Sequence, residues 1–115
     1  FYAAWRTTGD VRFRDLAREI TRLIVDHCCF QENGRWIAAT AIRYLQGAQE
    51  GNALPASSYY TGSPDVHTQI SFWSWILPAV LICRELYTGV DAARVARCNA
   101  ILQDVVPNGP TNWAD

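Results

Sequence analysis

Residues 10–26 read DVRFRDLAREITRLIVD, and this stretch decides the fold class. Apolar residues recur there three and four positions apart, which places them on one face of an α-helix. Acids and arginines alternate on the opposite face, where pairs at this spacing stabilise a helix by about 0.2–0.5 kcal/mol each. The predicted inner face is Phe13, Leu16, Ala17, Ile20, Leu23 and Ile24, and the predicted ion pairs are Asp10/Arg14, Asp15/Arg18, Glu19/Arg22 and Arg22/Asp26.

A turn of the same chemistry precedes this helix and recurs near the end of the chain. Gly9 supplies the positive φ that closes a helix over residues 1–6, and Asp10 caps the next helix. Gly89 and Asp91 repeat this design, and Pro107 to Pro110 stop the helix that follows. Its predicted inner face is Val95, Cys98, Leu102, Val105 and Val106. Two helix–turn–helix units of similar design indicate an internal repeat.

Two more helices are predicted between these units. One runs from about Trp36 to Gln49, after the turn signal of residues 32–34. The other begins at Ser63-Pro64-Asp65, which offers an N-cap, a proline at the first position and an acid in the first turn. It is apolar nearly all round, so we expect burial on several sides and a kink or break at Pro78. No strand signal has comparable strength. The prediction is a single all-α domain over residues 1–115, with about five helices in antiparallel hairpins.

Composition narrows the classes of partner. The chain has 115 residues, 50% of them apolar and 12% aromatic, which is typical of a globular domain. A net charge of -1 gives no electrostatic reason to expect nucleic acid or an anionic membrane as a partner. The longest uncharged apolar run, Ile70 to Cys83, is too short to span a bilayer, so we expect no membrane span. Because the sequence contains no Met, we expect a mature chain or a piece of a longer helical protein.

The four cysteines indicate neither a metal site nor a fixed redox state. Cys28 and Cys29 are adjacent, which is a poor arrangement for chelating a tetrahedral metal. Cys83 and Cys98 flank a predicted turn and can approach each other, although buried free thiols are the favoured interpretation. His27 and His67 add further zinc-ligand types without a recognisable spacing, and we predict no metal and no cofactor.

The two hairpins, Phe1–Ile24 and Phe72–Val106, resemble those of (α/α) toroid proteins of the glycoside hydrolase and polysaccharide lyase type. In both, a helix is followed by a Thr-Gly turn with an acid and then by a second helix. The resemblance covers about two-thirds of the chain. It implies that ligand contacts come from the loops that enter the inner helices, which here precede residues 36 and 69.

Those loops, Cys28–Arg35 and Gly51–Gln69, and the helix starts that follow them contain aromatic residues beside acids. Sugars bind to the faces of aromatic rings, and glycosidases transfer protons with pairs of carboxyl groups. The predicted ligand-binding residues are Tyr59, Tyr60, Trp36 and Trp73, and the catalytic candidates are Glu32, Asp65 and His67.

Several of these candidates have a structural alternative. Asp65 also fits as a helix-start acid that offsets the helix dipole, and His67 fits as a solvated or hydrogen-bonded histidine. Trp73 and Trp75 also fit as core residues. Only Tyr59 and Tyr60 lie in a loop that helix formation does not explain.

Two functional hypotheses follow. The first is a carbohydrate-binding or carbohydrate-processing segment of a toroid-type protein, with a glycan as its ligand. The second is a non-catalytic helical scaffold or assembly subunit. In that case the apolar, aromatic surface is an interface with a second copy or with helices of the parent chain.

Overall fold

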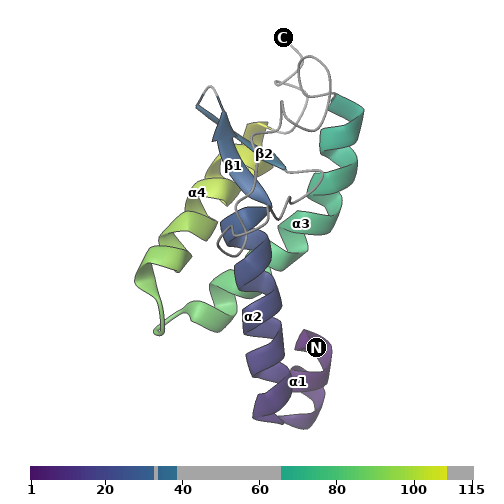
Figure 1. Ribbon diagram of the computed structural model, residues 1–115, viewed down its shortest axis with the longest axis vertical. Coiled ribbons are helices and arrows are strands. Elements are labelled where there is room, and N and C mark those ends of the chain that lie inside the picture. Colours follow the sequence, from purple (N-terminus) through teal and green to yellow (C-terminus); the bar gives the residue numbers. More distant parts are fainter. Residues whose placement is uncertain (33, 39–65, 109–115) are drawn as a thin grey trace, which may run out of the picture.

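The computed structural model describes residues 1–32, 34–38 and 66–108, and for Glu32 and residues 66–69 it describes the backbone alone. This part of the chain is mostly helical, with four helices and one two-stranded sheet. The elements are α1 (Tyr2–Thr8), α2 (Val11–His27), β1 (Cys29–Glu32), β2 (Arg35–Ala38), α3 (Val66–Tyr87) and α4 (Ala92–Asn108). Helix α3 packs against both α2 and α4, and α1 folds back beside the first turns of α2 (Figure 1).

Both predicted turns have the chemistry that the sequence indicates. Gly9 and Gly89 adopt φ values of 70° and 81°, and Gly9 N–H donates to the Trp5 carbonyl at the end of α1. Asp10 accepts a hydrogen bond from the backbone amide of Arg12 at 3.0 Å. Asp91 accepts from the amide of Arg94 at 3.1 Å. The two hairpin turns are therefore confirmed, whereas a sequence repeat stays a prediction.

The helix predicted to begin at Trp36 is wrong at its start. Residues 29–32 and 35–38 form an antiparallel hairpin that pairs Phe30 with Ile37 and Gln31 with Trp36. Gly34, at φ 76°, makes the turn between the strands. The rest of that predicted helix, residues 39–49, lies outside the described residues. The described elements are thus four helices and a β-hairpin, not five helices and not a toroid.

The hairpin forms because its backbone and side chains find partners on the helices. Asp104 of α4 accepts hydrogen bonds from Arg35 Nε and from the Trp36 amide, both at 2.8 Å. Trp36, Ile37 and Ala38 are buried, and β2 contacts both α3 and α4. These long-range contacts override the helical periodicity that follows Trp36.

The core lies where α2, α3, α4 and the hairpin meet. Its fully buried members come from every one of these elements. They are Val25 of α2, Cys29 and Ala38 of the hairpin, Trp73, Val80 and Cys83 of α3, and Cys98 and Ile101 of α4.

The buried side of α2 overlaps the predicted one only in part: Ala17 is buried and Ile24 packs against the core, as expected. Ala17, Thr21 and Val25 face the core, while Leu16 and Ile20 remain 45% and 42% exposed. Three of the four predicted ion pairs form, with the shortest N–O distance, 2.5 Å, between Arg22 and Glu19. Arg14 pairs with Asp15 instead of Asp10.

Helix α3 runs through Pro78 without a break. Proline has no amide hydrogen, so the Ser74 carbonyl lacks its usual donor one turn further on. Ser74 and Pro78 are both exposed, so they lie on the solvent side of the helix. The predicted split is therefore wrong. The proposed helix start at Ser63-Pro64-Asp65 lies outside the described residues.

Within the described residues, one helical window, Ile70–Tyr87, is long and apolar enough to cross a membrane by length and composition. Helices in the centre of a folded core pass the same test, and 39% of this window is buried in the protein. The structure is weakly consistent with the expectation of no membrane span.

Candidate functional site

The two tryptophans predicted to bind a ligand belong to the core. Trp36 is 6% exposed and Trp73 is 2% exposed, and both lie in one cluster with residues of α2 and α4. The guanidinium of Arg97 lies over the Trp36 ring, 4.9 Å from its centroid. A stacked sugar needs an accessible ring face, and neither ring offers one here.

The other predicted site residues are only partly covered by the structure. Tyr59, Tyr60 and Asp65 lie outside the described residues. Glu32 ends strand β1 and His67 lies in the first turn of α3, but their side chains are not described. The structure therefore brings Trp36 and Trp73 together and leaves the rest of the proposed carbohydrate site as a prediction.

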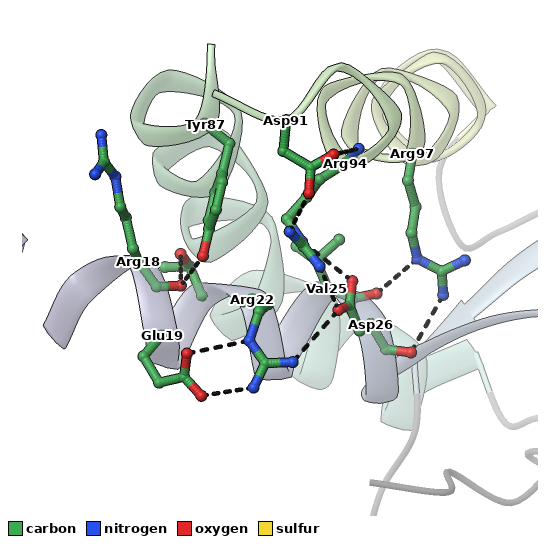
Figure 2. Close-up of polar contacts among 10 residues, drawn as sticks. Arg18, Glu19, Arg22, Val25, Asp26, Tyr87, Asp91, Arg94 and Arg97 are labelled. Atoms are coloured by element: carbon green, nitrogen blue, oxygen red, sulfur yellow. Dashed lines mark hydrogen bonds and ion pairs between the residues drawn. The ribbon is translucent and has the colours of Figure 1, made fainter. Parts of the chain in front are cut away.

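The densest polar cluster connects α2 to α4. Arg94 of α4 donates to Asp26 of α2 at 2.9 Å and to Asp91 at 2.5 Å (Figure 2). Asp26 also lies 3.8 Å from Arg22, which pairs with Glu19. The hydrogen bond to Asp26 is the main cause that raises the pKa of Arg94.

A second arginine of α4 closes the end of α2. Arg97 donates to the carbonyl of Val25 at 2.9 Å (Figure 2) and to the carbonyl of Cys29 at 2.8 Å. The last carbonyls of a helix have no partner within it, and a cation there also favours the helix dipole. Arg97 thus stabilises the point where the chain leaves α2 and enters β1.

A third set of contacts connects α2 to the end of α3. Arg18 Nε donates to the Leu86 carbonyl at 3.0 Å, and the Tyr87 hydroxyl donates to the Arg18 carbonyl at 3.1 Å. Arg94 lies over the Tyr87 ring, 4.8 Å from its centroid. Each of these polar groups is used in a contact between helices. The cluster in Figure 2 therefore has the properties of a structural connection and not of a ligand site.

The cysteines are free thiols, and three of the four are buried. Burial raises the pKa of Cys29 to about 12, which makes it a poor nucleophile. The thiol of Cys98 hydrogen-bonds to Cys83 and lowers the pKa of Cys83. The predicted approach of these two residues therefore occurs, with both sulfur atoms inside the core. Among the described residues, no group of three or more His, Cys, Asp or Glu side chains is arranged to hold a metal ion.

The outer side of α3 and α4 has a different character. From Ile70 to Leu81, every exposed residue of α3 is uncharged. The three charged residues of α4, Arg94, Arg97 and Asp104, reach inward to α2 and the hairpin. Four large apolar side chains of these two helices are exposed, and we call them the outer face: Ile70 (47%), Trp75 (80%) and Leu81 (46%) of α3, and Val106 (64%) of α4.

A groove of about 350 Å³ lies between α3 and α4 on this side. Its apolar residues are Leu81, Leu102, Val106 and Pro107, and its polar residues are Arg84, Asn99 and Gln103. The volume lies at the lower end of small-molecule pockets, which span about 300–1,000 Å³. It contains no carboxyl group and no aromatic ring, so it lacks the residue types of a sugar-cleaving site.

The sequence contained a signal for this surface. No Asp, Glu, Arg or Lys occurs from Val66 to Cys83, so no outward side of that helix can be charged. The expectation that Trp75 packs in the core is wrong, because Trp73 and Trp75 lie about 200° apart around the helix axis. Burying one of them exposes the other.

No protein-family model, no curated protein and no solved structure matches this chain.

Proposed function

We propose that this chain is a non-catalytic helical assembly module that docks on another helical surface through its outer face. The proposal is supported by what the described residues offer and by what they lack. Their polar clusters are used between helices, and their most exposed large apolar side chain, Trp75, lies on α3. Exposed apolar patches of this kind mark interaction sites in soluble proteins.

The exposure of Trp75 is the observation that carries the proposal. An indole that is 80% exposed on an uncharged helix side has no structural role in the described fold. Tryptophan is among the residues most enriched where interfaces gain their binding energy. Ser71, Ser74 and Pro78 surround it on the same side of α3, so a partner can approach without desolvating a charge.

Sedimentation velocity over a range of protein concentrations tests this proposal. We expect the wild-type chain to self-associate and Trp75→Gln to need at least about tenfold more protein for the same degree of association. Val90→Gln is the matched control, since Val90 is 60% exposed in the turn between α3 and α4 and lies off the outer face. A wild-type chain that stays monomeric at every concentration would contradict the proposal.

The carbohydrate function is a second proposal, and it comes from the sequence of residues 51–69. The paired Tyr59 and Tyr60 favour it, as does the resemblance to toroid hairpins. Binding of the wild type and of Tyr60→Ala to a glycan panel tests it directly. The expected result is a glycan that binds the wild type and binds the variant more weakly. Equal binding by both chains, or none by either, would remove its support.

A further inference from the structure

A second exposed apolar surface of this chain lies on α2, and helix packing offers a way for it to meet the groove. Leu16 and Ile20 stand one helical turn apart on α2, and we call them the α2 strip. Residues at this spacing form a convex ridge, and helix packing places such ridges into grooves. The groove between α3 and α4 is concave, and two concave surfaces cannot fill each other.

The charges beside these two surfaces are also complementary. Arg84 borders the groove, and its described side-chain partner is the neutral amide of Asn99 at 3.3 Å. Within the described residues, its guanidinium contacts neither a carboxylate nor a backbone carbonyl. The strip is flanked by Asp15 and Glu19, whose side chains are 60% and 57% exposed, and by Arg12 one turn before Leu16; Glu19 is paired with Arg22. Arg14 and Arg18 both contact Oδ1 of Asp15, so Oδ2 can accept from another donor.

Both surfaces are accessible in a single copy. Leu81 and Val106 of the groove are 46% and 64% exposed, and Leu16 and Ile20 of the strip are 45% and 42% exposed. The strip belongs to α2 and the groove to α3 and α4, so one copy cannot fill its own groove without unpacking its core.

We propose that the groove between α3 and α4 binds the α2 strip of a second copy, so that copies associate head to tail. This inference rests on the proposed assembly function and names its partner. Leu16 and Ile20 enter between Leu81 and Val106, and Asp15 meets Arg84. In a head-to-tail assembly, the groove is free at one end and the strip is free at the other. Further copies can therefore add until a ring closes.

A complementation experiment with two double variants tests this arrangement. Leu16→Gln with Ile20→Gln removes the strip, and Leu81→Gln with Val106→Gln removes the apolar part of the groove. All four positions are exposed, and glutamine is a good helix former that adds no charge. Circular dichroism and thermal unfolding establish that both variants fold like the wild type.

We expect each double variant alone to associate at least about tenfold more weakly than the wild type. An equimolar mixture then contains one intact groove and one intact strip, and it should form a dimer that grows no further. Sedimentation velocity resolves this capped dimer from the larger wild-type assemblies. Val90→Gln serves as the control and should associate like the wild type.

The outcomes separate this inference from the proposed function. If the wild type associates but the strip variant associates equally well, or if the mixture forms no capped dimer, the head-to-tail arrangement is wrong and the assembly function stands. If the wild type never associates, both fail. A decrease of association in Arg84→Glu, with Val90→Gln unchanged, would further support the contact between Arg84 and Asp15.

Discussion

Helices α2 and α3 show two ways in which an apolar helix fits the same core. Helix α2 has seven charged residues in Val11–His27, and they pair along its surface and with α4. Helix α3 has two charged residues in Val66–Tyr87, both after Cys83. Each helix buries one side, but only α2 covers most of its outer side with charge. The comparison teaches that α3 leaves an uncharged side exposed in the single chain, and this is the side that we propose a partner covers.

Substitution of the two tryptophans of α3 should give the largest difference in the free energy of unfolding. Trp73→Ala should lower the free energy of unfolding by about 3–5 kcal/mol, because it leaves a cavity beside α2 and α4. Trp75→Ala should change it by no more than about 0.5 kcal/mol, as is usual for exposed positions. Urea unfolding of dilute protein measures both. Similar losses in the two variants would show that the inner and outer sides of α3 are not distinct.

The next largest expected effect comes from removing a contact between α2 and α4. Arg97→Ala should cost about 1–3 kcal/mol, because it leaves the carbonyls of Val25 and Cys29 without their donor. Arg12→Ala is the control, since the Arg12 side chain is 84% exposed and its effect should stay within about 0.5 kcal/mol. Thermal or urea unfolding compares the two. Equal changes in the free energy of unfolding would mean that the hydrogen bonds of Arg97 do not stabilise the end of α2.

The smallest expected effect is a pH dependence at the start of α2. The side-chain contact with Arg12, and then its backbone amide, lower the pKa of Asp10 below its ordinary value of 3.8. A lowered pKa in the folded state contributes stability above pH 3.8, and this contribution is lost as the pH falls through the folded value. Asp10→Asn keeps the cap and removes the charge. The stability difference between wild type and variant should therefore shrink as the pH falls below 3.8, whereas a constant difference would contradict this account.

Local rules predicted the elements whose partners are close in sequence. The turns at Gly9 and Gly89 depend on a positive φ and an adjacent acid, and both occur as expected. Helix α2 has its cap and most of its ion pairs for the same reason.

Elements whose contacts lie far away in the sequence were not predicted correctly. Asp104 fixes Arg35 and Trp36 in a strand across 68 or more positions, and no local pattern contains that information. The side of α2 that faces the core also depends on where α3 and α4 lie. A helix with Phe13, Leu16 and Ile20 on one side and Ala17 and Val25 on another can bury either. Ala17 and Val25 face the core, where their small side chains allow α3 to approach closely, while Leu16 and Ile20 remain exposed to solvent.

The candidate site was harder to predict than the fold. Aromatic residues beside acids suggested a ligand site, yet Trp36 and Trp73 complete the core. The outer face has no chemical motif, because its signal is an absence of charge over four helical turns. Periodicity detects which residues share a side of a helix, and it does not tell whether the protein itself or a partner covers that side.

Hydroxyl-radical footprinting of the two tryptophans in α3, at low and at high protein concentration, tests the central claim most directly. Trp73 should be oxidised slowly at both concentrations, since the core covers it. Trp75 should be oxidised rapidly in the dilute protein and much more slowly in the concentrated protein, once a second copy covers the outer face. Rapid oxidation of Trp75 at both concentrations, or slow oxidation in the dilute monomer, would contradict the claim that this helix meets its own core on one side and a partner on the other.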